Sequence, residues 1–203
     1  MKRQGRIYAI LILLVVAGCE QSYTPGSVRV SFSPKGGCTE MVVQEIDAAR
    51  AKIRVQAYSF TSAPIAKALL EAHKRGVDVA VLLDRSNEKD KYSSADFLHN
   101  VGIPMRIDAQ HAIAHNKIII IDDKTVLTGS FNFTKQAEES NAENLLVLQD
   151  PALAQRYTEI WELHAAHCED YVSKREAGEG SSRGRSSGRT ANSSGETLSG
   201  HRR

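Results

Sequence analysis

The sequence predicts a single α/β domain built on a mixed β-sheet. Short apolar segments rich in valine and isoleucine alternate along the chain with longer amphipathic segments, as strands alternate with helices in such domains. This alternation extends over residues 28–172, a length that suits one domain with its own core. The run 118–121 consists of four isoleucines and predicts a strand buried on both faces.

Each expected element has a local signal. The strands are predicted from apolar runs bounded by turn residues, at 28–33, 53–60, 77–83, 104–107, 118–121, 125–128 and 143–148. The helices are predicted from apolar residues at helical spacing and from their end signals, at 39–51 with Thr39 as N-cap, 62–76 with Ser62 as N-cap, 94–101, and 151–167. We expect 84–92 to be a loop, and 134–141 to be either a loop or a short helix.

The first eighteen residues have the layout of a secretory signal peptide, with a basic start and an apolar run at 7–16. Residues 16–19 resemble a bacterial lipobox, which would make Cys19 a lipidated mature N-terminus. Ordinary cleavage and an uncleaved anchor are the alternatives. All three predict an exported protein, either periplasmic or attached to the membrane as a lipoprotein, with 19–27 as a polar tether.

The C-terminal segment 173–203 is rich in glycine, serine and arginine and is predicted to be disordered. It carries seven basic residues against three acidic ones, whereas the body between Cys19 and Val172 carries 16 basic and 21 acidic residues. Global charge therefore gives no support for nucleic-acid binding, and any attraction to phosphate must be local.

Two cysteines remain if Cys19 is processed, namely Cys38 and Cys168. An oxidising compartment favours a disulfide between them, which would join the first helix to the last one. Two unpaired thiols are the alternative, because the sequence does not fix the distance between them.

The candidate catalytic residues lie in the stretch 115–132. Strand alternation places His115 and Lys117 on one face, and Ser130 and Asn132 on one face if the extended backbone continues past Gly129. A hairpin that turns at 122–124 brings the two pairs together. A neutral imidazole can attack phosphorus, while an ammonium and an amide stabilise the phosphate oxygens, so the set predicts hydrolysis of a phosphodiester.

The spacing of His115, Lys117, Asp122, Gly129, Ser130 and Asn132 resembles the HKD motif of the phospholipase D superfamily. The resemblance extends from about Val28 to about Tyr171 and is closest to short, single-motif bacterial members, many of them secreted or periplasmic nucleases. It implies a sheet with helices on both sides, a phosphohistidine intermediate, and no metal or other cofactor. It also implies that Glu143 hydrogen-bonds the histidine, whereas Asp122 and Gly129 are expected to fix local structure.

A single motif raises the question of the second catalytic group. In-line displacement needs an acid on the far side of phosphorus, and single-motif members of the superfamily form homodimers with the site on the two-fold axis. We therefore expect His115 and Lys117 from two chains in one cleft. His111 is the internal rival for the second histidine.

Other residues near the motif have two interpretations each. Tyr58 lines either the cleft or the core, and Phe131 and Phe133 are expected in the core. His164, His167 and Cys168 resemble metal ligands but lack a fourth ligand at a suitable spacing, so no metal site is predicted.

The motif specifies the bond but not the substrate. We expect a sequence-nonspecific endonuclease on DNA or RNA. The alternatives are a phospholipase D that hydrolyses phosphatidylcholine-type lipids, held at a bilayer by its lipid anchor, and an inactive protein that binds nucleic acid or lipid.

Overall fold

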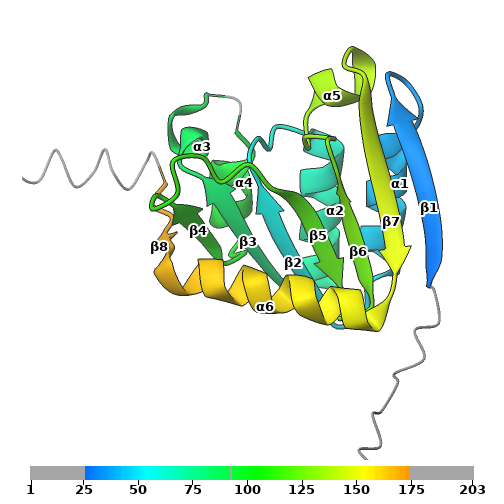
Figure 1. Cartoon of the computed structure of the whole chain (residues 1–203). Coiled ribbons are helices and arrows are strands. Elements are labelled where there is room, and N and C mark those ends of the chain that lie inside the picture. The colour runs from blue at the N-terminus through cyan, green and yellow to red at the C-terminus, as the bar shows by residue number, and fades with distance from the viewer. Residues whose placement is uncertain (1–25, 92, 174–203) are drawn as a thin grey trace, which may run out of the picture.

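The computed structural model describes residues 26–91 and 93–173, and within them the chain forms one eight-stranded sheet (Figure 1). The strands, in the spatial order β1-β7-β6-β5-β2-β3-β4-β8, are β1 Ser27–Ser33, β7 Glu143–Gln149, β6 Thr125–Gly129, β5 Lys117–Ile121, β2 Lys52–Ala57, β3 Asp78–Asp84, β4 Met105–Asp108 and β8 Glu169–Asp170. Strands β2, β3 and β4 are parallel, and the other neighbours are antiparallel. The predicted mixed sheet is confirmed.

Helices cover both faces of this sheet, as the resemblance implied. One face packs against α1 Cys38–Ala48, α2 Ala63–Lys74 and the short α4 Ala95–Asn100. The long α6 Pro151–His167 crosses the other face. Two short helices, α3 Ser86–Lys89 and α5 Lys135–Glu139, lie in connections beyond the same ends of the strands (Figure 1).

The isoleucine run in β5 is buried on both sides, as predicted. Ile119 and Ile121 belong to the core under α1 and α2, whereas Ile118 and Ile120 belong to the core under α6. Because side chains alternate along a strand, this short strand anchors both layers of the domain. Its position at the centre of the sheet fixes where its first residue, Lys117, must lie.

The start of α1 differs from the prediction. The helix begins at Cys38, and Gly37 rather than Thr39 is its N-cap, with no hydrogen bond from a capping side chain. The Glu138 carboxylate of α5 accepts hydrogen bonds from the backbone N–H groups of Gly37 and Thr39, at 3.0 and 2.7 Å. A carboxylate distant in sequence therefore caps this helix, which local sequence signals cannot reveal.

Two further elements were not expected. The loop predicted at 84–92 contains α3, and the chain after α6 adds the two-residue edge strand β8 beside β4. Both are too short to leave an apolar period in the sequence.

Of the two alternatives for Cys38 and Cys168, the structure has the unpaired thiols and not the disulfide, because both cysteines within the described residues are free. Cys38 is buried in the core on the α1 face, whereas Cys168 packs against the core on the α6 face. The sheet therefore separates the two sulfur atoms. Burial raises the pKa of both thiols, that of Cys168 to about 11, so both remain protonated at neutral pH.

Several predictions concern residues outside 26–91 and 93–173. These are the signal peptide at 1–18, the lipidation of Cys19, most of the tether and the tail beyond Ser173. The folded domain begins with Ser27, one residue before the predicted boundary. In the part of the chain that the structure describes, none of the helices combines the length and apolar character needed to cross a bilayer.

Asp122 holds the end of the β5–β6 hairpin against the start of β2. Its carboxylate accepts hydrogen bonds from the backbone N–H groups of Arg50, Ala51 and Lys52, at 2.8–2.9 Å. Burial acts to raise the pKa of Asp122, but these three donors outweigh it and hold the pKa below its usual value. Asp122 thus fixes local structure, at the opposite end of β5 from His115.

We predict that Asp122→Asn lowers the free energy of unfolding by about 2 kcal/mol at pH 7, because a charge-assisted acceptor for three amides is lost. Asparagine tolerates the left-handed backbone at this position (φ 52°), so the substitution isolates the charge. Because the folded pKa is depressed, the stabilisation is full above the unfolded pKa of about 3.9 and is lost as pH falls through the folded value.

The measurement is urea unfolding of both proteins from pH 7 to pH 3. Asp123→Asn is the matched control, because Asp123 has a similar φ of 53° but is exposed and contacts the side chains of Lys52 and Thr158 instead of backbone N–H groups. A cost for Asp122→Asn no larger than that of the control, or independent of pH, would contradict the assignment.

Candidate active site

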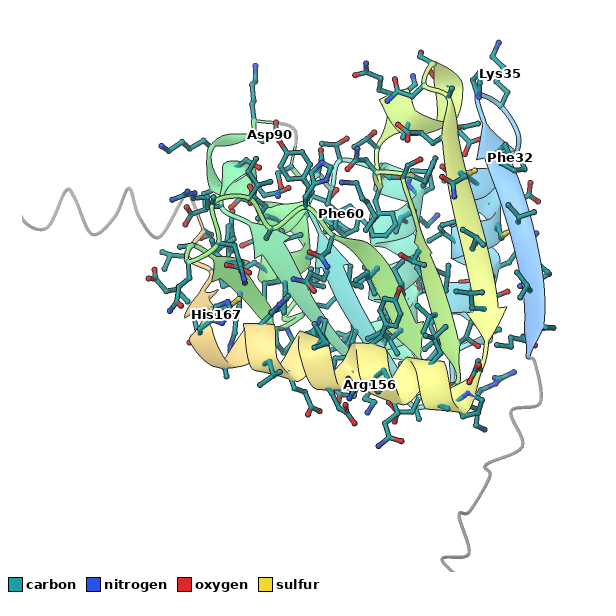
Figure 2. All side chains as sticks on the ribbon, in the orientation of Figure 1. Phe32, Lys35, Phe60, Asp90, Arg156 and His167 are labelled. Atoms are coloured by element: carbon teal, nitrogen blue, oxygen red, sulfur yellow. The ribbon has the colours of Figure 1, made fainter. Side chains whose placement is uncertain are left out.

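The motif residues lie at one end of the central strands, where β2 ends and β5 begins. The backbone N–H of Tyr58 donates to the carbonyl of Asn116 (2.8 Å), which holds the two strand ends together. The Tyr58 ring then lies against the imidazole of His115, with ring centroids 4.6 Å apart. His115 is exposed, and Figure 2 shows the neighbouring Phe60 at the same end of the strands. Tyr58 therefore lines the cleft, the first of its two expected positions.

Lys117 is buried, with only 7% of its surface exposed. Its Nζ donates a hydrogen bond to the carbonyl of His115 (3.0 Å) and lies 5.0 Å from the centroid of the Tyr58 ring. Burial lowers the pKa of the Lys117 ammonium, and the negative charge of Glu143 acts in the opposite direction. The site thus contains a poorly hydrated cation next to an accessible imidazole.

Glu143 does not make the contact that the resemblance implied. Within residues 26–91 and 93–173 of the single chain, no hydrogen bond joins Glu143 to His115. Its Oε1 accepts a hydrogen bond from Nδ2 of Asn141 (3.0 Å), and its charge acts on Lys117. Glu143 begins β7, two strands away from β5, and in this chain it supports the charge of the lysine rather than orienting the imidazole.

The segment after β6 is fastened to β7 at Asn144. The Asn144 carbonyl accepts hydrogen bonds from the N–H groups of Ser130 and Phe131, at 3.1 and 3.2 Å, and its N–H donates to Oγ of Ser130 (3.1 Å). The exposed Ser130 side chain thus helps to position the motif. A Cβ on Gly129 would lie 2.2 Å from the Asn144 carbonyl oxygen, so glycine permits this close approach and has a role in local structure.

Asn132 lies in the chain between two core residues. Phe131 and Phe133 are buried, as predicted. The Asn132 Oδ1 is buried and has no hydrogen-bond partner among the described residues. A buried amide that leaves an atom unpaired is costly, so its position suits a group that meets substrate.

Asn132 and Tyr58 border an open groove beside α5. The side chains along it are mostly polar, and the lining consists of Tyr58, Ser59, Thr61, Asp90, Asn132, Thr134, Lys135, Gln136, Glu139, Ser140 and Asn141. Of the predicted catalytic residues, Asn132 therefore borders an open surface groove rather than a closed pocket.

Two positioning residues were missed in the sequence. Asn87 in α3 is buried, and its side chain accepts from the N–H of Phe60 and donates to the carbonyl of Tyr58. Asp84 at the end of β3 accepts from the N–H of Ala114 (2.8 Å) and so holds the approach to His115. Their only sequence signal was a polar residue at or just after the end of a buried strand.

His111 is not placed as the second histidine. Its Nδ1 lies 2.8 Å from Oδ2 of Asp108, and its ring packs against those of His164 and His167. Among the described residues, the ring contact of His115 is with Tyr58. The single described chain therefore supplies one imidazole to the motif.

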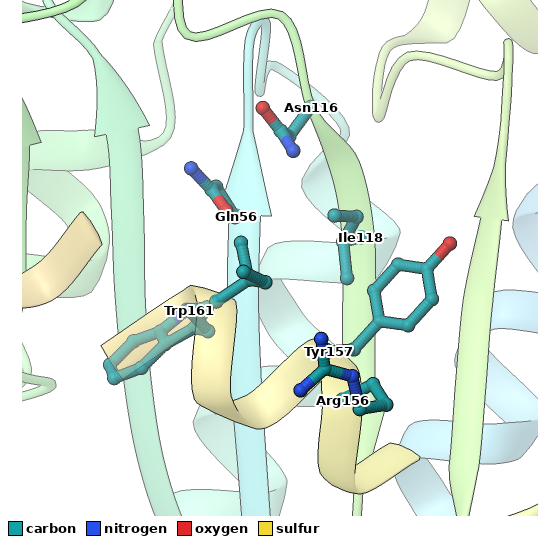
Figure 3. Close-up of a pocket in the computed structure, with 7 residues that line it drawn as sticks. Gln56, Asn116, Ile118, Arg156, Tyr157 and Trp161 are labelled. Carbon is teal, nitrogen blue, oxygen red and sulfur yellow. The ribbon is translucent and has the colours of Figure 1, made fainter. Parts of the chain in front are cut away.

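A second hollow lies on the other face of the sheet, beneath α6. It is lined by Gln56, Asn116, Ile118, Arg156, Tyr157, Ile160 and Trp161 (Figure 3). Asn116 and Ile118 alternate along the chain with His115 and Lys117, so their side chains point to the opposite side. This hollow is therefore not part of the motif site.

The family model described as "Cardiolipin synthase, PLD-like domain" matches residues 42–164, more than half of the chain. The chain belongs to the phospholipase D superfamily and is a phosphodiesterase of that superfamily. The match includes the HKD motif residues and Glu143.

Two kinds of curated relatives share this region. A phospholipase D from Rickettsia conorii is 47% identical over 134 residues, which are 66% of this chain and 67% of the relative. A mitochondrial cardiolipin hydrolase from Chlamydomonas reinhardtii is 32% identical over 149 residues, which are 71% of this chain and 62% of the relative. The chain thus spans about two thirds of their length.

Solved structures show the same fold. The phospholipase D family member Nuc from Salmonella typhimurium is 45% identical with a TM-score of 0.70, over 72% of this chain and 99% of that one. NucT from Helicobacter pylori is 25% identical with a TM-score of 0.63, over 71% of this chain and 100% of that one.

We predict that Gly129→Ala lowers the free energy of unfolding by at least about 3 kcal/mol, because the new Cβ would overlap a backbone carbonyl that cannot move without breaking the β6–β7 ladder. Gly102→Ala is the matched control, since Gly102 has a φ of +83° and nothing within 4 Å of its Cβ position. The control should cost only about 1 kcal/mol of backbone strain. Equal losses in thermal or urea unfolding would show that the close approach to Asn144 does not matter.

Proposed function

We propose that the chain is a metal-independent, sequence-nonspecific endonuclease that cleaves DNA or RNA through a phosphohistidine at His115. The observation that carries this proposal is the open, polar groove that reaches Asn132 and Tyr58. A nucleic-acid backbone is polar and continuous, so it needs a channel that is open along its length. A phospholipid would need an apolar approach for its acyl chains.

Charge in the groove favours a local rather than a diffuse attraction for phosphate. Lys135 in the lining forms an ion pair with Glu139 (3.6 Å), so the channel is not strongly cationic. The positive charge available to the reacting phosphate is that of Lys117, which is buried and weakly screened. This arrangement suits catalysis on any phosphodiester without recognition of sequence.

The similarity to Nuc and NucT supports a nuclease over a phospholipase, because this chain covers almost the whole length of both structures. Nuc shares 45% of its aligned residues.

We further propose a homodimer whose two-fold axis passes through the active site. The single chain supplies one exposed imidazole, whereas in-line displacement needs groups on both sides of phosphorus. An isologous dimer would bring two copies of His115 and Lys117 to one phosphate. The exposure of His115 leaves it open to such a partner.

The proposed reaction has two displacements at phosphorus. First, a neutral ring nitrogen of one His115 bonds to phosphorus, the P–O bond to the leaving alcohol breaks, and the protonated His115 of the partner subunit gives its proton to that oxygen. Second, the partner's His115 takes a proton from water, the new hydroxide bonds to phosphorus, and the P–N bond breaks. Lys117 and the amide of Asn132 stabilise the charge on the non-bridging oxygens.

The alternative substrate is a phospholipid. The curated relatives are named phospholipase D and mitochondrial cardiolipin hydrolase, and Ile113, two residues before His115, is 58% exposed. An apolar side chain so close to the motif could enter a bilayer surface. Export and lipidation of Cys19, which remain proposals, would place the enzyme at a membrane under either substrate.

We predict that the full-length protein in EDTA cleaves plasmid DNA or RNA, and that His115→Ala lowers this rate by at least about a thousandfold, because the nucleophile is lost. Parallel assays on phosphatidylcholine vesicles test the alternative. Lys74→Ala, an exposed residue on α2, is the control and should retain the wild-type rate. Choline release without cleavage of either nucleic acid would overturn the nuclease proposal.

The shared site predicts dominant inactivation. After subunit exchange with a ninefold excess of His115→Ala, about a tenth of wild-type chains have a wild-type partner, so activity per wild-type chain should fall about tenfold. The same excess of Lys74→Ala should leave total activity per functional chain unchanged. Unchanged activity per wild-type chain in the His115→Ala mixture would show that one chain suffices.

A further inference from the structure

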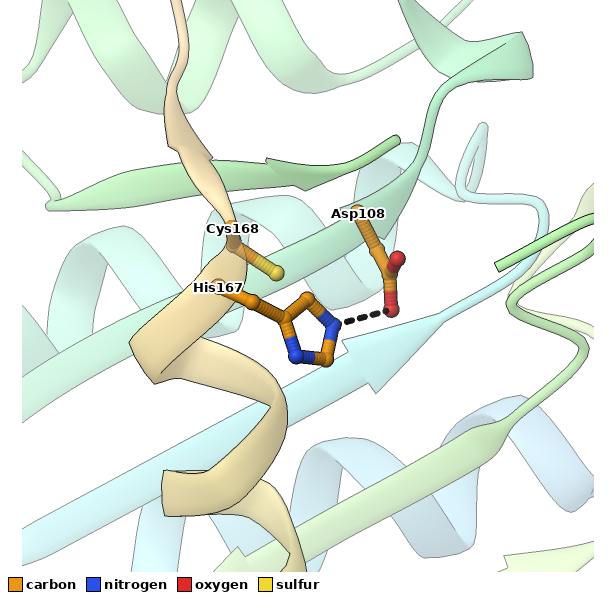
Figure 4. A group of neighbouring side chains, drawn as sticks. All are labelled: Asp108, His167 and Cys168. Atoms are coloured by element: carbon orange, nitrogen blue, oxygen red, sulfur yellow. Dashed lines mark ion pairs between the residues drawn. The ribbon is translucent and has the colours of Figure 1, made fainter. Parts of the chain in front are cut away.

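A second cluster of polar side chains lies away from the motif, where β4 and α6 end. Asp108 closes β4, while His167 closes α6 and is followed by Cys168. One ligand atom from each of these three residues lies within 4.8 Å of the others (Figure 4). The sequence showed His167 and Cys168 but gave no reason to join them to Asp108, because the fold brings the two segments together.

The carboxylate of Asp108 is the centre of this cluster. Asp108 is 0% exposed, and its Oδ2 lies 2.8 Å from Nδ1 of His111 and 3.5 Å from Nε2 of His167. The rings of His111 and His167 are 5.1 Å apart between centroids. Two imidazoles, a thiol and a buried carboxylate thus converge on one small volume.

The second observation is a nitrogen that has an ion-pair contact with Asp108 (Figure 4) but no hydrogen bond. Nε2 of His167 is buried and has no hydrogen-bond partner among the residues that the structure describes. Its distance of 3.5 Å from the Asp108 carboxylate is too long for a good hydrogen bond. Leaving a buried imidazole nitrogen unpaired costs free energy, which a bound cation would remove.

We propose that Asp108, His111, His167 and Cys168 bind one zinc ion. Nitrogen, thiolate and carboxylate donors in a set of four are the ligands that Zn²⁺ prefers, whereas Mg²⁺ and Ca²⁺ require mostly oxygen. Ligand atoms around tetrahedral zinc lie about 3.3–3.7 Å apart, so the three ligand atoms of Asp108, His167 and Cys168, which lie within 4.8 Å of one another, need to approach by only about 1 Å. His111 is placed as the fourth ligand by its contact with Asp108, since its Nδ1 lies 2.8 Å from Oδ2.

His164 borders the site without being a ligand. Its Nδ1 lies 2.8 Å from Nε2 of Gln56, and its ring packs against those of His111 and His167. It therefore packs between the sheet and the two imidazoles that are proposed as ligands, and it supports their positions.

The role of the zinc would be structural. It would join the end of β4, the connection that carries His111, and the end of α6. That connection continues to His115, but Asp84 holds it at Ala114 and Asp108 holds it at His111 without any metal. We therefore expect catalysis to survive a chelator, and the test uses binding rather than activity.

The test is titration of the full-length, metal-free protein with Co²⁺, in a His115→Ala, Cys19→Ala background that removes the motif histidine and the third cysteine. We expect one equivalent per chain, the visible absorption of tetrahedral cobalt, and a thiolate-to-cobalt charge-transfer band. Zn²⁺ should displace the cobalt and raise the melting temperature of the protein.

Variants assign the ligands. Cys168→Ser should abolish the charge-transfer band and, like His167→Gln, weaken binding by at least about tenfold. Cys38→Ala and His73→Gln are the matched controls and should bind as the parent does. Melting of each variant without metal confirms that it is folded. Weak octahedral absorption in the parent, or a charge-transfer band that persists in Cys168→Ser, would overturn the proposal.

Discussion

The antiparallel pairing of β5 with β6 at the centre of the sheet is the constraint on which the site depends. Because β5 is buried on both faces, a slip of its register by one residue would move every isoleucine into the opposite core. Asp122 ties one end of this hairpin to β2, and the contact of Gly129 with Asn144 ties the other end to β7. The rigid sheet thereby holds three motif residues near the same ends of its central strands, namely His115, Lys117 and Ser130.

Two neighbouring side chains of the site differ in their exposure to solvent, and the chemistry of the site follows from this difference. Lys117 is withdrawn from water next to the Tyr58 ring and near Glu143, whereas His115, which contacts the same ring, stays accessible. A fixed, poorly hydrated cation stabilises phosphate oxygens effectively, and an exposed imidazole can meet both substrate and a second subunit. The domain thus presents one accessible imidazole beside one buried cation.

The sequence predicted what depends on local pattern and spacing. Apolar periodicity located seven of the strands and the main helices, and the spacing from His115 to Asn132 located the motif. Contacts between distant segments were beyond it: Glu138 capping α1 and Asn87 holding Tyr58. The choice between a disulfide and two free thiols stayed open for the same reason, since the sequence does not show that the sheet separates Cys38 from Cys168.

Trapping the covalent intermediate tests the central claim most directly. The full-length protein in EDTA would be quenched during turnover of end-labelled DNA and RNA, and separately of labelled phosphatidylcholine, and the modified peptide would be sequenced by mass spectrometry. The account predicts a nucleotidyl adduct on His115 that is stable in base and labile in acid. An adduct formed only from the phospholipid, or one carried by another residue, would contradict it.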